Sequence, residues 1–481
     1  MTIARRPPGP PQRLLTGSFK DFRRDLLGFL TRIARQYGDV TWFRLGRRPC
    51  ILINHPDLIE NVLVKNNRNF IKPFAFQFTR PVLGNGLLTS EGEFWKRQRR
   101  LAAGAFRGDR ISGYGPDMVA ATVRMLDTWQ DGQTRDIHAD MMQVTLDIVA
   151  TTLFGADVTD QSHEIDESLR SVLRAFGASF NRMAPLPSWF PMLGKRRARA
   201  AVRGLNGVVQ RLIDERRRDS QPRNDLLSMM LNARDEDDGS QMTDLQLADE
   251  ARTFLLAGHE TTALTLSWSF YLLANHPQAQ AQLQTELQSV LGDRLPEVAD
   301  IPRLKFAEQI VLEAMRLYPP AFMIGREPLA DCELGGYTIP AGTTIFMSPW
   351  VMHHDERFYE RPERFEPERW VGERAAALPK MAYFPFGGGP RICIGNTFAM
   401  MESVLLLTTI VQGWSLRLVA DHPIKLSPVL TLRPRYGIKV VVSKRPQGSA
   451  AAEVGGTTQY LQAGAPCSRS HEHGTQPPAN T

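Results

Sequence analysis

The residues with the clearest chemical role surround a cysteine near the C-terminal end of the chain. Cys393 lies in the segment Phe386–Gly395, which reads FGGGPRICIG. Glycines adopt backbone angles that let several N–H groups point at one sulfur atom, and such donors stabilise a thiolate. Arg391 can neutralise an acidic edge of the group that carries the metal. The spacing therefore predicts a thiolate ligand for iron, whereas a lone cysteine elsewhere is usually a small core residue.

This segment resembles the haem-binding loop of the cytochrome P-450 family, in which a proximal cysteine thiolate pushes electron density onto the iron. The resemblance implies that haem b is the cofactor, with Cys393 as its axial ligand and Phe386, Gly387 and Arg391 around it. It extends over roughly residues 7–444. The implied fold is mainly α with a minor β part, a triangular helix-rich domain with haem between an oxygen-activation helix and the helix after the cysteine.

A second group of residues lies in a helical pattern from Thr243 to Ala274. Thr253, Ala257 and Thr261 are four residues apart, so they share one helix face. Glu260 and Thr261 form an acid–alcohol pair, which can supply protons for cleavage of an O–O bond. The string matches the oxygen-activation motif of the family, so Glu260 and Thr261 are the predicted catalytic residues. Otherwise Thr261 would only bond within its helix and Glu260 would be a surface acid.

The predicted helix from Leu304 to Tyr318 carries Glu313 and Arg316, whose spacing of three lets them pair. In the family, this pair joins an arginine of a Pro-Glu-Arg-aromatic segment in a structural, non-catalytic triad. Two such segments occur in tandem here. We expect Arg369 to complete the triad and keep Arg364 as the alternative.

Trp95 and Arg99 also lie four residues apart and can both donate hydrogen bonds to a carboxylate. The family resemblance implies that they contact a haem propionate from the side opposite Arg391. Neighbouring basic residues would then face outward, as a docking surface for an acidic ferredoxin or flavodoxin or as ordinary solvated side chains. These residues are Lys96, Arg97, Arg100 and Lys380.

The resemblance also indicates which segments line the substrate pocket. The predicted lining is apolar and comprises Leu88, Thr253, Ala257, Ala321, Phe322 and Leu430. An apolar pocket favours an apolar substrate, because buried charges would be left unpaired. Fatty acids, terpenoids and steroids fit this description equally well.

The elements that must position these residues follow from the hydrophobic pattern. Short β-rich runs are expected at Val40–Phe43, Cys50–Asn54 and Ile438–Val442, with helices dominating between about Pro56 and Tyr318 and again from Asn396 to Gln412. We divide the chain into a proline-rich segment (1–12), one catalytic domain (13–445) and a tail (446–481) whose composition predicts disorder.

Composition limits the remaining classes of function. The chain has 481 residues and a net charge of +7, but its basic residues are scattered and no nucleic-acid-binding motif accompanies them. Its four cysteines lack metal-finger or disulfide spacing. No apolar run suits a transmembrane anchor, so we expect a soluble, cytoplasmic protein, although Pro185–Pro191 could touch a membrane surface weakly.

The sequence thus predicts a haem-thiolate monooxygenase that inserts one oxygen atom from O2 into an apolar small molecule. By the resemblance, its electrons come from NAD(P)H through a separate ferredoxin or flavodoxin and its reductase. Two alternatives stay open: a haem-thiolate isomerase or dehydratase that needs no external electrons, and a non-catalytic haem sensor. The sequence does not indicate an oligomeric state.

Overall fold

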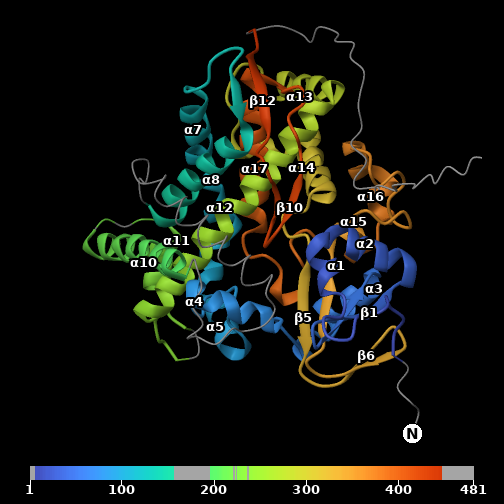
Figure 1. The fold of residues 1–481 in the computed structure, drawn as a ribbon. Coiled ribbons are helices and arrows are strands. Elements are labelled where there is room, and N and C mark those ends of the chain that lie inside the picture. Colours follow the sequence, from blue (N-terminus) through green and yellow to red (C-terminus); the bar gives the residue numbers. More distant parts are fainter. Residues whose placement is uncertain are drawn as a thin grey trace, which may run out of the picture.

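The longest helix among the described residues, α12 (Asp244–Asn275), runs through the middle of the molecule (Figure 1). A capping box begins it: Thr243 Oγ1 accepts from the Gln246 N–H at 3.3 Å, and Gln246 Oε1 accepts from the Thr243 N–H at 2.9 Å. Most of its side chains are buried against α8, α14 and α17. The helix that carries the predicted oxygen-activation motif is therefore held from several sides.

This computed structural model describes residues 6–155, 195–219, 221, 223, 225–235 and 238–446, without the side chains of 78, 82 and 195–201. The α-helices are α1 (Phe19–Arg24), α2 (Leu26–Tyr37), α3 (Pro56–Glu60), α4 (Arg80–Leu83), α5 (Gly92–Ala103), α6 (Gly108–Ser112), α7 (Gly115–Leu126), α8 (Ile137–Phe154), α10 (Lys195–Arg218), α11 (Leu226–Asn232), α12, α13 (Pro277–Val290), α14 (Lys305–Leu317), α15 (Pro349–His353), α16 (Gly372–Ala377) and α17 (Asn396–Gly413).

The strands of the described residues form four sheets. The largest has the order β1-β2-β8-β5-β3 and the next β4-β12-β9, while β6-β7 and β10-β11 form two-stranded sheets. The strands are β1 (Val40–Leu45), β2 (Arg48–Ile53), β3 (Phe70–Ile71), β4 (Thr134–Asp136), β5 (Ile324–Pro328), β6 (Cys332–Leu334), β7 (Tyr337–Ile339), β8 (Thr344–Met347), β9 (Trp414–Leu418), β10 (Leu426–Pro428), β11 (Leu432–Pro434) and β12 (Lys439–Lys444). The predicted mainly α fold with a minor β part is confirmed.

The main core lies where α8, α12, α14 and α17 meet. Trp268 of α12 is fully buried there and donates from Nε1 to the carbonyl oxygen of Leu432 at 3.0 Å. This bond fixes β11 alongside α12. It thereby brings residues from the C-terminal end of the chain to the centre of the molecule.

The proline-rich N-terminal segment packs against β1. The Trp42 N–H donates to the carbonyl oxygen of Pro8 at 2.8 Å, and the Arg6 guanidinium lies 4.0 Å from the Trp42 ring centroid. The tail beyond residue 446 and the Pro185–Pro191 stretch lie outside the described residues. Within the described part, none of the helices is both long and apolar enough to span a bilayer.

Candidate active site

The cysteine loop, residues 386–395, leads directly into α17. Gly389 adopts a φ of +66°, and a Cβ there would lie 1.9 Å from the Leu63 carbonyl oxygen, so only glycine fits. The Cys393 N–H donates to the carbonyl oxygen of Phe386 at 3.0 Å. These constraints hold the loop in one path and place Cys393 three residues before the first turn of α17.

Cys393 is reachable by water although protein surrounds it. Burial raises the pKa of the Cys393 thiol, while the Gly395 N–H and the positive charge of Arg99 act in the opposite direction. Its sulfur is therefore open to a small group on one side and desolvated on the others. Its thiolate needs a further positive partner, and an iron ion would be one.

Four charged residues meet beside this loop. Arg391 donates to Glu91, and the backbone N–H of Lys72 donates to Glu91 Oε1 at 2.8 Å. The Lys72 Nζ donates to the carbonyl oxygens of Leu87 at 3.0 Å and Ser90 at 2.6 Å. Burial is the main cause that lowers the pKa of Lys72 to about 7; Arg391 and Arg326 act in the same direction and Glu91 opposes them. Arg391 Nη1 is buried and has no hydrogen-bond partner among the described residues.

The charges of this cluster suit a cofactor that carries carboxylates. Arg391 and Arg326 both lie near Glu91, and Lys72 has Glu91 and Glu250 as nearby carboxylates. Burial lowers the pKa of Arg326 to about 10, with Arg391 adding to the effect, so both arginines stay charged at neutral pH. Such an excess of buried positive charge is costly unless an anion joins it. The two propionates of haem have the required charge, so the residues present fit this cofactor.

The predicted contacts Trp95 and Arg99 belong to α5. The Arg391 guanidinium lies 4.4 Å from the Trp95 ring centroid, and that of Arg99 lies 5.9 Å away. Trp95 therefore lies near both arginines. The expected propionate contact of Trp95 and Arg99, from the side opposite Arg391, stays a prediction.

One face of α12 remains open at its centre. Ala257 is exposed and Thr261 half-buried, although most other residues between 247 and 273 are buried. On another face, a Cβ on Gly258 would contact Val149 of α8 at 3.3 Å. The described protein thus packs against Gly258 and leaves the surface at Ala257 and Thr261 uncovered, as a flat cofactor with substrate would require.

The two residues of the acid–alcohol pair make different contacts. Thr261 Oγ1 donates to the Ala257 carbonyl oxygen at 2.8 Å. Glu260 is 2% exposed and its Oε1 accepts from Arg433 Nε at 2.6 Å, with Arg433 Nη2 also at 2.6 Å and the Thr431 hydroxyl donating to the same oxygen. All three of these contacts involve Oε1 of Glu260 and none involves Oε2.

The other predicted pocket residues are divided between the interior and a small cavity. Thr253 is buried and donates to the Asp249 carbonyl oxygen at 2.8 Å, while Leu88 and Ala321 are half-buried. Phe322 and Leu430 line a cavity of about 80 Å³. Its other lining residues are Arg48, Pro73, Phe74, Ala75, Phe76, Met323, Gly325, Glu327, Thr344, Phe346 and Val429.

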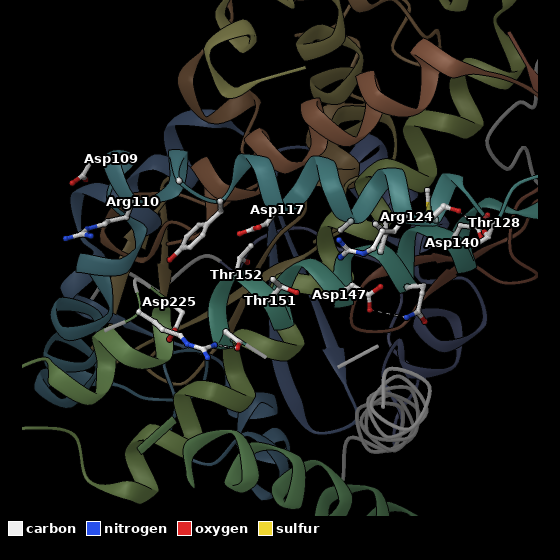
Figure 2. Close-up of a pocket in the computed structure, with 18 of the residues that line it drawn as sticks. Asp109, Arg110, Asp117, Arg124, Thr128, Asp140, Asp147, Thr151, Thr152 and Asp225 are labelled. Carbon is white, nitrogen blue, oxygen red and sulfur yellow. Dashed lines mark hydrogen bonds between the residues drawn. The ribbon is translucent and has the colours of Figure 1, made fainter. Parts of the chain in front are cut away.

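A larger cavity of about 1050 Å³ lies between α7 and α8 (Figure 2). None of the predicted site residues lines it. Charged side chains surround it, among them Asp117, Arg124 and the Arg135–Asp140 ion pair with its 2.7 Å contact. This lining does not suit an apolar substrate, so size alone does not identify the active site.

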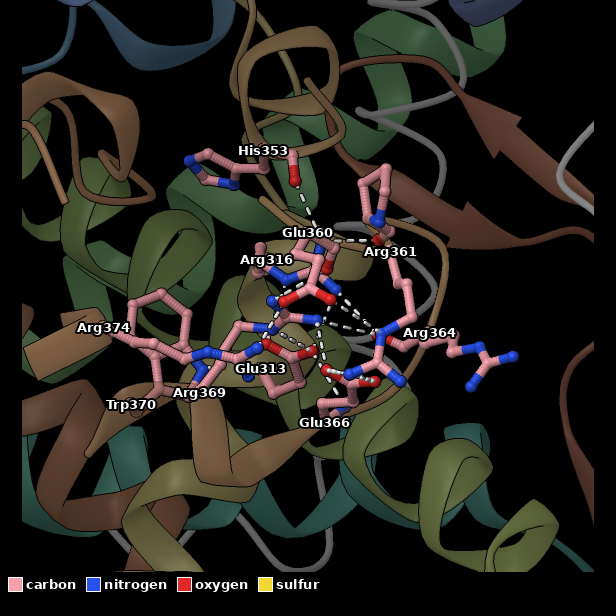
Figure 3. A network of polar contacts seen from close by, with 11 residues as sticks. Glu313, Arg316, His353, Glu360, Arg361, Arg364, Glu366, Arg369, Trp370 and Arg374 are labelled. Carbon is pink, nitrogen blue, oxygen red and sulfur yellow. Dashed lines mark hydrogen bonds and ion pairs between the residues drawn. The ribbon is translucent and has the colours of Figure 1, made fainter. Parts of the chain in front are cut away.

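Glu313 lies at the centre of a buried polar network (Figure 3). Its two carboxylate oxygens accept from Arg316 Nη2 at 2.8 Å and Nε at 2.9 Å, and Arg369 Nε donates to Oε1 at 2.9 Å. Trp370 Nε1 donates to Oε2 at 3.0 Å. We call Glu313, Arg316, Arg369 and Trp370 the Glu313 network.

The same network separates the two candidate arginines. Arg369 reaches Glu313 with its side chain, whereas Arg364 contributes only its carbonyl oxygen, which accepts from Arg316 Nη2 at 2.9 Å. Arg316 and Glu313 are fully buried. Because removing one partner of such a pair is strongly destabilising, the contacts suit a structural role.

The outward basic residues near α5 are partly engaged by acidic residues. Arg97 Nε lies 3.4 Å and Arg100 Nη2 3.2 Å from Oδ2 of the buried Asp235, and Lys96 Nζ lies 2.5 Å from Glu93. Lys380 is exposed. Arg97, Arg100 and Lys96 therefore already have acidic partners within the protein, so less of this positive charge is available to an electron donor than the sequence alone indicates.

Sequence reasoning missed Lys72, Arg326, Glu91, Thr431 and Arg433. Each lies far along the chain from the residue it contacts, so no local spacing marks it. One signal was present: Arg433 is a charged residue inside the short strand β11, directly after an apolar turn. A charge at such a position needs a partner.

Comparison with known proteins identifies the family. The family model for cytochrome P450 matches residues 7–442. Cyclooctat-9-en-7-ol 5-monooxygenase of Streptomyces melanosporofaciens is 37% identical over 384 residues, which cover 79% of this chain and 83% of that protein. Pentalenene oxygenase of Streptomyces avermitilis is 34% identical over 417 residues, covering 86% and 92% respectively.

A solved structure agrees with these matches. The crystal structure of the cytochrome P450DA heme domain superimposes with a TM-score of 0.84 and 27% sequence identity, covering 92% of this chain and 99% of that one. This chain belongs to the cytochrome P450 family and is a P450 monooxygenase.

Proposed function

We propose that the protein oxidises a polycyclic terpenoid, using electrons from a separate acidic ferredoxin or flavodoxin whose reductase takes them from NAD(P)H. Two relatives support the substrate class, because their names specify pentalenene and cyclooctat-9-en-7-ol, which are both carbocyclic terpenoids. The small cavity supports it through the apolar part of its lining, which includes Phe322, Leu430 and Phe346, although Arg48 and Glu327 are charged. Such a lining gains free energy by burying hydrocarbon surface.

In this proposal, Cys393 ligates the iron and the neighbouring cations hold the propionates. Arg391, Lys72 and Arg326 supply the positive charge, and Trp95 and Arg99 close the same side. The bound haem supplies the redox chemistry by which O2 is used. The protein residues position it and keep the thiol sulfur near the Gly395 N–H and the Arg99 charge, which favour the thiolate.

The exposed face of α12 would orient substrate and deliver protons. Thr261 Oγ1 can turn from the Ala257 carbonyl oxygen toward the open space, since a hydroxyl rotates to suit its partners. Glu260 Oε1 is held by Arg433 and Thr431, which leaves Oε2 to accept a proton from water and pass it on. Arg433 thereby fixes where the carboxylate lies.

The electron donor would dock on the side of the molecule that carries α5. Lys380 is exposed and Lys96 is more than half exposed, so both can meet acidic groups of a partner. Arg97 and Arg100 are engaged by the buried Asp235, whereas Lys96 pairs only with the exposed Glu93. We therefore expect charge reversal at Lys96 or Lys380 to slow electron transfer more than reversal at Arg97. A salt titration of the reduction rate measures this difference.

Optical titration of the ferric protein tests the substrate class. Polycyclic terpene hydrocarbons and alcohols are added in parallel with fatty acids and steroids, and the spin-state change of the Soret band is recorded. We expect a saturable change with terpenoids and a product one oxygen atom heavier when surrogate reductases are supplied. Saturation by fatty acids or steroids alone would refute the terpenoid assignment and leave the family membership untouched.

A further inference from the structure

His353 is a buried residue with no part in the chemistry described so far. It ends α15 and has no solvent-exposed surface. Its ring centroid lies 5.0 Å from that of Tyr383, and Phe384 meets it edge-to-face at 5.6 Å. Two aromatic side chains that lead toward the cysteine loop therefore pack on this imidazole.

Two hydrogen bonds connect His353 to opposite sides. Its carbonyl oxygen accepts from Arg316 Nη1 at 2.9 Å, a bond visible in Figure 3. Its Nε2 lies 3.1 Å from the Phe384 nitrogen and accepts from that N–H. His353 thus joins the Glu313 network to the backbone just before the cysteine loop.

The hydrogen bonds continue from Phe384 to the cysteine. The Phe384 carbonyl oxygen accepts from the Gly387 N–H at 2.9 Å, and the Phe386 carbonyl oxygen accepts from the Cys393 N–H at 3.0 Å. The anchored nitrogen and the sulfur-bearing residue therefore belong to one hydrogen-bonded unit. A shift at Phe384 must change the path of this unit.

The imidazole of His353 is suited to accept this bond. Burial lowers the pKa of His353 well below the ordinary histidine value, and the nearby His354 and Arg316 side chains lower it too. The carbonyl groups of Met315 and Arg316 raise this pKa, but by less. The ring is therefore neutral, and Nε2 carries the lone pair that the Phe384 N–H needs.

We propose that His353 is a positioning residue for the cysteine loop, anchoring the Phe384 N–H to the Glu313 network so that Cys393 is held as an iron ligand. Without the acceptor, a buried N–H would stay unpaired, and the loop would open more often to regain it from water. A looser loop would let the sulfur leave the iron as a protonated thiol. This inference depends on Cys393 as the ligand and not on the proposed substrate.

Three variants of the haem-loaded protein test it. His353→Phe keeps a ring against Tyr383 and Phe384 but removes the acceptor, whereas His353→Gln retains an acceptor on a side chain of similar reach. His354→Phe is the matched control, because His354 is the adjacent buried histidine and its Nδ1 contacts the Trp350 carbonyl oxygen at 2.7 Å instead of the loop.

Two measurements report on the opening of the cysteine loop and on the iron ligand, and neither depends on catalytic activity. Amide hydrogen exchange of Phe384, Phe386 and Gly387, with and without haem, should be at least about fivefold faster in His353→Phe. The ferrous–CO spectrum should show a larger fraction of the thiol-ligated form. His353→Gln should restore both toward the parent values, and His354→Phe should leave both unchanged.

The proposal is overturned if His353→Phe keeps the parent exchange rates and thiolate spectrum, or if His354→Phe changes them equally. Should His353→Phe fail to fold, His353→Asn replaces it, since its shorter amide cannot reach the Phe384 N–H. Equal exchange and equal spectra in His353→Asn and His353→Gln would then overturn the proposal. Loss of terpenoid binding alone would concern only the proposed substrate.

Discussion

The ion pair between Glu260 and Arg433 gives the sharpest quantitative prediction. Glu260 is 2% exposed, and both Arg433 contacts to its Oε1 measure 2.6 Å. Replacing Arg433 with Met leaves the carboxylate buried without its counter-charge, a change that commonly costs about 3–5 kcal/mol. The Thr431 hydroxyl still donates to the same oxygen and offsets about 1 kcal/mol.

Exposure reduces the expected effect further. The Arg433 side chain is 21% exposed, so water can enter at this end and partly solvate the carboxylate. We expect Arg433→Met to lower the free energy of unfolding by about 2–3 kcal/mol. In the double variant Glu260→Gln/Arg433→Met, most of this loss should disappear, because no buried charge is left unpaired.

Denaturant unfolding of the four proteins in a double-mutant cycle measures the coupling energy. Arg435→Met serves as the control, since Arg435 lies two residues away, is exposed and contacts the Tyr436 ring at 5.6 Å. Its loss should change stability by no more than about 0.5 kcal/mol. If Arg433→Met costs no more than Arg435→Met, Glu260 is not held by Arg433 and the proposed place of the acid is wrong.

Three further outcomes are expected. Burial raises the pKa of Glu250 from 4.5 to about 7, so between these pH values the folded protein retains a proton that the unfolded chain loses. Stability should therefore fall by about 3 kcal/mol as pH rises through this interval, and urea unfolding of Glu250→Gln should show no such fall. Thr261→Ala should lower product formation about a hundredfold at undiminished NAD(P)H consumption, while an equal loss in Thr265→Ala would speak against a special role. Lys72→Met should release haem to apomyoglobin about tenfold or more faster, and unchanged release, as expected for the exposed Lys65→Met, would remove Lys72 from the propionate site.

Much of the fold follows from local sequence patterns. The predicted helices Thr243–Ala274, Leu304–Tyr318 and Asn396–Gln412 correspond to Asp244–Asn275, Lys305–Leu317 and Asn396–Gly413 in the structure. The start at Asn396 agrees, and the other five ends differ by one residue because caps and turns decide the boundaries. Helix periodicity and the glycines around Cys393 are properties of neighbouring residues, so the sequence shows them directly.

The contacts that complete the site could not be read in this way. Arg433 meets Glu260 only because β11 lies beside α12, and Lys72 meets Glu91 and Arg391 through three separate segments. The choice between the tandem Pro-Glu-Arg segments is different: the sequence favoured Arg369 over Arg364, and it is the Arg369 side chain that contacts Glu313. Long-range partners of buried charges depend on topology, which no local pattern encodes.

The central claim is that Cys393 ligates the haem iron as a thiolate. The ferrous–CO absorption spectrum of the haem-loaded protein tests it most directly, with Cys393→Ser compared against Cys50→Ser, a change at a buried cysteine in β2. We predict the thiolate-type Soret band in the parent protein and in Cys50→Ser, and its complete loss in Cys393→Ser. Retention of that band in Cys393→Ser would contradict the account.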